Sequence, residues 1–346
     1  MKKKVLRIAT TDIGPHTEKL TSAILSFVED RFEIEKTFAY NADYVFHSCL
    51  GYDVLKYSGI RIFITEENVT PHFAISDYAM AFDQLTFGDR YLWLPLIRLY
   101  HEAYTVLTAP RPSVDEIFRN KTDFCAYVMS NTTDSAEERT RIFDLLSAYK
   151  PVNSGGRWRN NVGGRVTDKL AFQSKHKFVI AFENCSHPGY LTEKFAEAAA
   201  ANAVPIYWGD PTIGKLFNTK AFINCHDFQT LEEAVDQVMR IDQDDNLYRQ
   251  MLAEPWFPGG VEPECLRDKT FADFLSNIFD QDPKSAFRRN RGRWGLKQER
   301  ILYRMHKHPM SHSIRRLRAR WLKLYHRIIP LHEYQGSTKK KDDAKK

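Results

Sequence analysis

Strand-like and helix-like segments alternate along most of this chain, and that order constrains the fold more than any other feature of the sequence. Short apolar runs of strand length are separated by stretches whose apolar residues recur at helical spacing, as Leu20, Ile24 and Val28 do. The strands expected in the first hundred residues are 5–9, 44–46, 60–64 and 78–82. Such an alternation favours an α/β protein with a parallel sheet and helices on its faces.

A second series of the same kind follows residues 108–123, a polar, proline-containing segment that is typical of a linker. Its expected strands are 124–129, 178–183, 204–208 and 221–224, and its expected helices are 135–149, 192–202, 230–241 and 264–280. The two series predict two Rossmann-like domains that face each other across a cleft. We expect them to comprise residues 1–118 and 119–283, with residues 284–346 forming a separate tail.

Nothing in the sequence indicates secretion or a membrane span. Arg7 and Asp12 interrupt the apolar run near the N-terminus, so the core of a signal peptide is missing. No stretch approaches the ~18 apolar residues that a membrane-spanning helix needs. The five cysteines show neither a CxxC pair nor zinc-site spacing. We therefore expect a cytoplasmic protein with buried, reduced thiols.

The segment 178–210 is the most informative part of the chain, because it predicts a strand, a loop, a helix and a second strand in close succession. Gly189 permits a sharp turn in the loop, and Thr192 is a candidate N-cap of the helix. Free backbone N–H groups and the helix dipole make such an N-terminus suitable for a diphosphate. Lys194 stands unfavourably close to this positive helix end, and an anionic ligand would explain it. The same pattern also fits an ordinary βαβ unit with a polar first turn.

Resemblance to a known family separates these two interpretations. The residues that carry it are Phe182-Glu-Asn184, Gly189-Tyr190, Thr192-Glu193-Lys194, Ala203 to Gly209, Asp227-Phe228, and, upstream, Phe82 to Leu92, Ser130-Asn131 and Gly155 to Asn160. Together they resemble the donor motif of the α1,3/1,4-fucosyltransferases, glycosyltransferase family ten, and in particular its bacterial members. The resemblance covers roughly residues 60–280. The extreme N-terminus and the tail resemble those of the family only in general character.

The resemblance implies a GT-B-like fold with two Rossmann-like domains, GDP-β-L-fucose as the donor, and an α-linked product formed with inversion. Tyr190, Glu193 and Lys194 match the donor-binding residues of the family, and Arg139 matches its phosphate-neutralising arginine. Asn184 is a further expected donor contact. Fixed cations at Arg139 and Lys194 would balance the charge that grows on the GDP leaving group.

Inversion in a single displacement needs a base that accepts the proton of the acceptor hydroxyl. The segment 61–68 ends an apolar strand with Glu66 and Glu67. It resembles a Thr-Gly-Glu-Asn motif of the family, and Glu67 matches the glutamate that acts as the base there. Glu66 replaces the glycine of that motif, and two adjacent carboxylates can raise each other's pKa. We expect Glu67 to be the base, with Glu66 as the alternative.

Metal binding is not expected from the acidic pairs in the chain. Asp242 and Asp244, and likewise Asp280 and Asp282, fit an Asp-x-Asp pattern, but both pairs lie at expected helix ends among polar residues and are typical of solvated turns. The family that the chain resembles holds its diphosphate with cations. We expect no obligatory cofactor, and at most stimulation by a divalent metal.

The tail is strongly basic. Residues 284–346 contain 20 Lys/Arg and 4 Asp/Glu, and within 314–328 a Trp/Leu/Ile stripe alternates with arginines at helical spacing. A basic amphipathic helix of this kind suits an anionic membrane surface. Docking onto the protein's own body and nucleic-acid binding are the alternatives.

Together these features predict an inverting α1,3-fucosyltransferase that acts on the GlcNAc of an N-acetyllactosamine-like acceptor, in a Lewis x-type glycan or a lipopolysaccharide. We expect it to be peripheral at the inner face of the bacterial inner membrane, without a nucleic-acid partner. A GT-B transferase with another nucleotide sugar and a nucleic-acid-binding protein that uses the tail are the alternatives.

Overall fold

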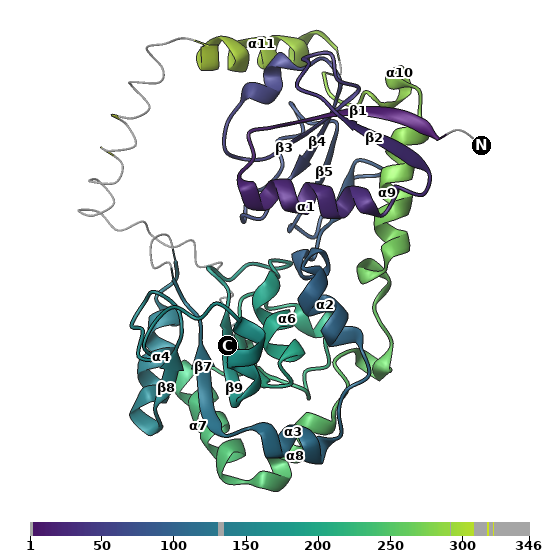
Figure 1. Cartoon of the computed structure of the whole chain (residues 1–346). Helices are drawn as coiled ribbons and strands as arrows, with labels where there is room; N and C mark the ends of the chain where they lie inside the picture. The colour runs from purple at the N-terminus through teal and green to yellow at the C-terminus, as the bar shows by residue number, and fades with distance from the viewer. Residues whose placement is uncertain (1–2, 131–134, 291, 308–316, 318–320, 322–346) are drawn as a thin grey trace, which may run out of the picture. The chain divides into compact units, whose positions relative to one another are not determined.

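The computed structural model describes residues 3–130, 135–290 and 292–307, together with Leu317 and Trp321. Residues Met1–Asn290 form one compact unit and Arg291–Lys346 a second one, and each is described by itself. The first unit contains two parallel sheets, each with helices around it (Figure 1).

The first sheet has six parallel strands in the order β2-β1-β3-β4-β5-β6. Its strands are β1 (Lys4–Thr11), β2 (Phe32–Lys36), β3 (Tyr44–His47), β4 (Ile60–Ile64), β5 (Tyr78–Ala81) and β6 (Tyr91–Trp93). The four predicted strands of this half are confirmed. Two strands of this sheet are not among the predicted ones. β2 is a short edge strand in which apolar and charged residues alternate instead of forming an apolar run, and β6 has only three residues.

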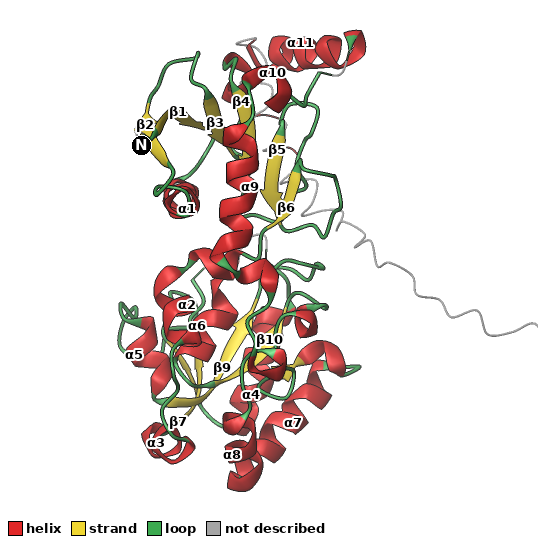
Figure 2. Cartoon of the chain, turned by 90° about the vertical axis from the view of Figure 1, so that its right-hand side faces the viewer, coloured by secondary structure: helices red, strands yellow, loops and turns green. Residues whose placement is uncertain are grey.

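The second sheet has five parallel strands in the order β11-β10-β9-β7-β8. Its strands are β7 (Asp123–Tyr127), β8 (Val152–Ser154), β9 (His176–Phe182), β10 (Val204–Trp208) and β11 (Ile223–Asn224), and the helices that follow them in the chain are α4 (Glu138–Tyr149), α5 (Lys169–Ser174), α6 (Glu193–Ala200), α7 (Leu231–Gln243) and α8 (Asp245–Ala253). Figure 2 shows β9 and β10 in the interior of this half, with helices on both sides.

Strand β9 lies between two separate cores. Val179 and Ala181 belong to the core that contains α6, whereas Ile180 and Phe182 belong to the core that contains α4 and α7. This division follows from the two-residue period of a strand, which sends alternate side chains to opposite faces of the sheet. The same alternation decides where the two residues after β9 point, as described below.

The segment between the two sheets is more ordered than predicted. The expected linker 108–123 contains the helix α3 (Val114–Asn120), whose N-cap Ser113 accepts a hydrogen bond from the backbone of Glu116. It is preceded by α2 (His101–Thr108). The segment joins the two sheets, as the sequence indicated, but it is partly helical, because its prolines precede α3 and do not interrupt it. The short 3-10 helices of this unit are Asp53–Lys56, Leu96–Leu99, Ile213–Lys215, Cys225–Asp227, Pro258–Gly260 and Glu264–Leu266.

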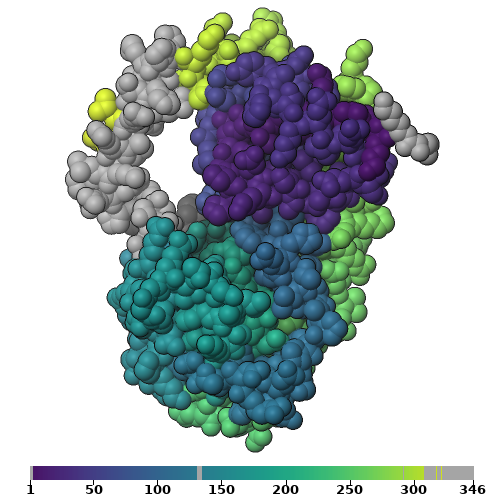
Figure 3. All heavy atoms as spheres, in the orientation of Figure 1, coloured from purple at the N-terminus to yellow at the C-terminus, as the bar shows by residue number. Residues whose placement is uncertain are grey.

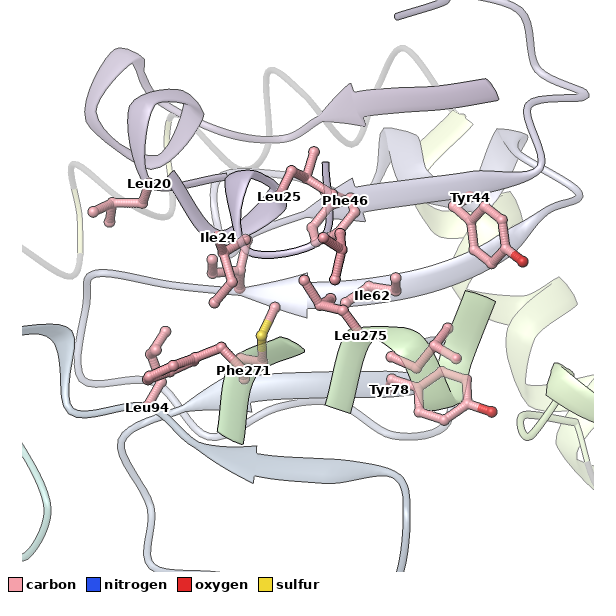
Figure 4. Close-up of a cluster of buried hydrophobic side chains, with 14 of the residues drawn as sticks. Leu20, Ile24, Leu25, Tyr44, Phe46, Ile62, Tyr78, Leu94, Phe271 and Leu275 are labelled. Atoms are coloured by element: carbon pink, nitrogen blue, oxygen red, sulfur yellow. The ribbon is translucent and has the colours of Figure 1, made fainter. Parts of the chain in front are cut away.

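Helix α9 (Asp268–Asp280) returns to the first sheet after the second sheet is complete. Its Phe271 stacks on Phe27 with ring centroids 5.2 Å apart, and its Phe279 packs edge-on against Phe32. Figure 4 shows Phe271 and Leu275 of this helix over the strands of the first sheet, and Figure 3 shows the light-green segment beside the purple N-terminal residues. The predicted domain limits, 1–118, 119–283 and 284–346, stay a prediction; α9, which they assign to the second domain, completes the core of the first sheet.

The chain that follows α9 is tied to the first sheet by a buried carboxylate. After α10 (Pro283–Ala286), the backbone N–H groups of Arg288 and Arg289 both donate to Asp77 Oδ1, and the Arg289 guanidinium pairs with Asp77 Oδ2. Asp77 is fully buried at the start of β5. This anchor holds the last residues of the first unit against the sheet.

The second unit contains α11 (Arg293–Lys307), none of whose residues is buried. The predicted amphipathic segment 314–328 lies outside the described residues, apart from Leu317 and Trp321. Within the part of the chain that the structure describes, no helix combines the length and the apolar character that crossing a bilayer requires.

Candidate active site

The loop between β9 and α6 passes directly beside the end of β5. Gly189 has a φ of 88°, and a Cβ atom added there would lie 2.2 Å from the carbonyl oxygen of Phe82. Trp93 donates its indole N–H to the Gly189 carbonyl at 3.2 Å. The predicted sharp turn is therefore present, and the close approach of a second backbone is an additional reason for a glycine.

Gly189→Ala is expected to destabilise the protein by about 2 kcal/mol or more, because the left-handed backbone and the contact with Phe82 both oppose a Cβ atom. Urea denaturation of the variant and the wild type measures this difference. Gly163→Ala is the matched control, since Gly163 also has a positive φ (82°) but has no atom within 4 Å of its added Cβ. A loss no greater than that of the control would contradict the role of the close approach.

Thr192 occupies the N-cap position of α6, but its side chain makes no capping hydrogen bond. Its hydroxyl donates instead to Glu183 Oε2 at 2.6 Å, and its backbone N–H donates to Glu183 Oε1 at 2.8 Å. The prediction that Thr192 caps the helix is correct for its position and wrong for its side chain. Glu183, one residue beyond β9, takes the hydroxyl because it is fully buried directly below the helix start.

Lys194 lies between two carboxylates. Its Nζ is 3.0 Å from Glu183 Oε2 and 3.3 Å from Glu193 Oε1. Burial acts to lower the pKa of Lys194, but these carboxylates together raise it above the usual value. The lysine near the helix N-terminus thus has an internal explanation that the sequence did not reveal, besides the anionic ligand that we expected.

Glu193 has a lowered pKa in this arrangement and is ionised at neutral pH. Burial acts to raise its pKa, but the Lys194 ammonium, assisted by Lys169, brings the pKa down to about 2. The side chains of Glu193 and Lys194 are 20% and 21% exposed, so both remain accessible to a ligand, whereas Glu183 is not. Burial raises the pKa of Glu183, with Lys194 acting in the opposite direction.

Arg139 and Asn184 are brought together. Arg139, in the first turn of α4, donates from Nη1 to Asn184 Oδ1 at 3.0 Å and to Ser135 Oγ at 2.9 Å. The arginine is 5% exposed, so it is a held side chain and not the solvated helix residue that its charged neighbours would indicate. The backbone N–H of Ala136 also donates to the Asn184 carbonyl at 2.9 Å.

Tyr190 is the predicted site residue that the structure buries most completely. It is 2% exposed, and its ring packs edge-on against Phe82 with centroids 4.6 Å apart. It belongs to the hydrophobic core of the first sheet although it comes from the loop that leads to α6. Tyr190 thereby fastens that loop to the first sheet.

Glu66 and Glu67 are placed differently, although they are adjacent. Glu66 accepts a hydrogen bond from the hydroxyl of Thr17 at 3.0 Å, whereas the exposed Glu67 carboxylate has no hydrogen bond or ion pair within the described residues. Partial desolvation and the charge of Glu66 raise the pKa of Glu67, and Lys194 acts to lower it. Glu67 therefore lies within the electrostatic influence of Lys194.

Three further contacts join loops of the first sheet to the segments around α6. Asn68 donates to the Cys185 sulfur at 3.3 Å, His187 Nε2 lies 3.2 Å from Asp83 Oδ1, and Gln84 donates to the hydroxyl of Thr212 at 2.8 Å. The loop that carries Glu67 thus adjoins the loop that leads to Lys194. The free carboxylate Glu67 thus lies on a loop of the first half that contacts the segment after β9, whose Glu183 and Asn184 hold the two cations.

The acidic pairs that resembled metal sites serve the fold. Asp242 is buried and paired with Lys150 and Lys177, which corrects the expectation of a solvated turn, and Asp244 caps α8. Asp280 pairs with Arg31, and Asp282 caps α10. Among the described residues, no three or more His, Cys, Asp or Glu side chains are grouped as metal ligands would be.

All five cysteines are free thiols, of which Cys125 and Cys225 are buried and Cys49 is exposed.

Glu183 is the functional candidate that the sequence interpretation left out. It belonged to the matched motif but carried no assigned role. The signal was available, because a carboxylate directly after the fully apolar strand 178–182 is costly unless a cation or several donors meet it. Thr192 and Lys194 are those partners.

The fold and the site define the class of the protein. Two Rossmann-like halves, with cations at the carboxyl end of the second sheet and a free carboxylate from the first, form the GT-B arrangement of glycosyltransferases. Family models agree: residues 8–100 match the α-(1,3)-fucosyltransferase FucT N-terminal domain, and residues 118–255 match the C-terminal part of glycosyltransferase family 10, the fucosyltransferases. The chain belongs to glycosyltransferase family 10.

Individual relatives support this assignment. The chain is 37% identical over 246 residues to the α-(1,3)-fucosyltransferase FucT of Helicobacter pylori, which covers 62% of the chain and 51% of that relative. It therefore spans about half the length of this curated relative. A crystal structure of an α1,3-fucosyltransferase is similar with a TM-score of 0.72 at 32% identity, covering 81% of this chain and 92% of that one. A second crystal structure, of α1,3-fucosyltransferase with GDP-fucose, gives a TM-score of 0.70 at 31% identity, with 82% and 92% covered.

Proposed function

We propose that this protein transfers L-fucose from GDP-β-L-fucose to the GlcNAc of an N-acetyllactosamine-like acceptor, with inversion at the anomeric carbon. The observation that carries the proposal is a family 10 fold in which the loop of the free carboxylate Glu67 contacts, through Asn68 and Cys185, the loop that leads to the held cation Lys194. The similar crystal structure with GDP-fucose supports the choice of donor. The acceptor is inferred from the sequence resemblance, as part of a Lewis x-type glycan or a lipopolysaccharide.

In the proposed mechanism, Glu67 accepts the proton of the acceptor hydroxyl as the bond from C1 to the GDP oxygen breaks. Lys194 and Arg139 stabilise the negative charge on the departing diphosphate, and Glu193 faces the donor from the same helix turn. Glu67 is preferred to Glu66 because the Glu66 side chain is turned toward Thr17, which donates to its Oε1, whereas the Glu67 side chain is exposed. We propose that the two cations make a metal dispensable, so that a divalent ion is at most stimulatory.

Incubation with radiolabelled GDP-fucose and N-acetyllactosamine tests the reaction, followed by linkage analysis of the product. A labelled trisaccharide with an α1,3 bond to GlcNAc is expected. Label on a different hydroxyl would contradict the proposed α1,3 linkage. If no β-galactoside accepted the label, the proposed class of acceptor would be wrong. A GT-B transferase with another nucleotide sugar is the second enzyme candidate, and a thermal-shift panel distinguishes it, since true donors raise the melting temperature.

The rate of transfer is expected to fall as the pH is lowered through the pKa of Glu67, because the base must be unprotonated. That pKa lies above the ordinary 4.5 partly because of the charge on Glu66. Glu66→Gln removes this charge and should shift the acidic limb of the kcat/KM profile to lower pH. An acidic limb that does not move would show that the titrating group is not next to Glu66.

We further propose that the protein is peripheral at the inner face of the inner membrane, bound through residues 314–328 and without a nucleic-acid partner. The arginines and the Trp/Leu/Ile stripe of that segment support this placement. Sedimentation with vesicles that contain anionic lipid, with and without the segment, tests it. Salt-sensitive DNA binding that requires the tail would favour the alternative.

A further inference from the structure

The two residues that follow β9 each hold one of the two cations of the site. Glu183 contacts Lys194, in the first turn of α6, and Asn184 contacts Arg139, in the first turn of α4. The two helices belong to the cores on opposite faces of the second sheet. Consecutive residues at a strand end point to opposite faces, so one dipeptide reaches both helices.

Glu183 is built into its place. Its carboxylate accepts hydrogen bonds from Thr192 N at 2.8 Å, from Thr192 Oγ1 at 2.6 Å and from Lys194 Nζ at 3.0 Å. It is fully buried, so it cannot touch a substrate directly. A Cβ atom at Gly209 would lie 2.4 Å from Glu183 Cγ, so the glycine after β10 makes room for this side chain.

Burying the Glu183 carboxylate costs free energy, so its presence needs a reason other than filling space. A buried charge is tolerated when a cation and several donors meet it, and a well-packed apolar side chain would serve stability as well or better. What the carboxylate adds is orientation, because it bonds the backbone and the hydroxyl of Thr192 as well as the ammonium group. The Lys194 ammonium is thereby fixed relative to the first turn of α6.

We propose that Glu183 and Asn184 are positioning residues that set Lys194 and Arg139 at the spacing required by the diphosphate of the donor. The inference rests on the proposed function, because it takes GDP-fucose as the donor. Glu183 acts through Lys194 and Asn184 through Arg139. Asn184, which we expected to contact the donor, acts in this proposal through its hydrogen bond to the arginine.

The test compares the affinities of GDP and GMP for the wild type and for Glu183→Gln, measured by isothermal titration calorimetry on the full chain. The glutamine keeps the size of the side chain but loses the negative charge opposite the Lys194 ammonium. Its single oxygen cannot replace both carboxylate oxygens, which accept from Thr192 N, Thr192 Oγ1 and Lys194 Nζ, so the lysine is held less firmly. We expect GDP affinity to fall about tenfold or more, as for the loss of a hydrogen bond to a charged group. GMP affinity should fall much less, because GMP lacks the β-phosphate, the group that is bonded to fucose in the donor.

Asp242→Asn is the matched control. Asp242 is also a buried carboxylate of the second half, paired with Lys150 and Lys177 and accepting a hydrogen bond from Tyr149, but it serves no part of the site. This variant should lose stability and keep both nucleotide affinities. Asn184→Ala should repeat the selective loss of GDP affinity through Arg139.

The outcomes separate the inference from the proposed function. Wild-type protein that does not bind GDP would overturn both. Wild-type binding with unchanged GDP affinity in Glu183→Gln, or with equal losses for GDP and GMP, would overturn the positioning role alone. If Glu183→Gln does not fold, Thr192→Val takes its place, since it removes the hydroxyl that bonds both Glu183 and Lys194; a selective loss of GDP affinity supports the role, and unchanged affinity overturns it.

Discussion

Glu67→Gln is expected to lower the rate of fucosyl transfer by about a hundredfold or more and to leave GDP affinity within about twofold. The amide cannot accept the proton of the acceptor hydroxyl, and the exposed Glu67 side chain has no bond within the described residues whose loss would disturb the fold. Single-turnover rates with GDP-fucose, together with calorimetric binding of GDP, measure the two quantities separately. A loss confined to KM would indicate a binding role and contradict the base assignment.

Glu66→Gln is the matched control for this prediction, since it makes the same chemical change one residue away. The glutamine can still accept the hydrogen bond from Thr17. We expect the rate at neutral pH to change by no more than about threefold, because the neighbouring base remains. If Glu66→Gln were the inactive variant and Glu67→Gln the active one, the roles of the two carboxylates would have to be exchanged.

Lys194→Met is expected to weaken GDP binding about a hundredfold and to destabilise the fold by about 3 kcal/mol at pH 7. The variant loses the cation opposite the diphosphate and leaves Glu183 and Glu193 without their shared partner. Methionine fills much of the volume of the lysine stem, so the loss reports charge more than packing. GDP titration and urea denaturation measure the two effects.

The pH dependence of stability distinguishes this explanation from a general loss of packing. In the wild type, Glu193 has a folded-state pKa of about 2, below the ordinary 4.5, so its contribution is present above pH 4.5 and is lost as the pH falls toward 2. Without Lys194, burial and mutual repulsion are expected to raise the folded-state pKa values of Glu183 and Glu193 above the unfolded ones, because burial already acts in that direction in the wild type. Lys194→Met should therefore gain stability as the pH falls from 7 to 5. A variant that is equally destabilised at both pH values would contradict the account.

The sequence predicted the class of fold because the main signals are local. Residues 178–182 of β9 are all apolar and are followed by the polar Glu183 and Asn184, so the composition of this run alone predicts a strand. The face that α9 covers was not predictable in the same way. The spacing of Phe271, Leu275 and Phe279 indicates a helix, but only contacts made far away in the chain show that its partners are in the first sheet.

The sequence named candidate site residues but not the contacts between them. The structure places three of them, Arg139, Asn184 and Lys194, around the end of β9, and their roles in donor binding stay a prediction. The partner of each cation came from the structure, because it depends on which face of the sheet a side chain reaches. The difference between Glu66 and Glu67 likewise depends on Thr17, a residue 49 positions earlier in the chain.

Helix α9 also has a consequence for how the protein is made. The ribosome releases the strands of the first sheet early, but the helix that covers part of their apolar face emerges only after the whole second sheet. Domains usually fold in the order of their synthesis. Here the half that is made first is completed last, so the growing chain carries an unfinished apolar surface until residues 268–280 have left the ribosomal tunnel.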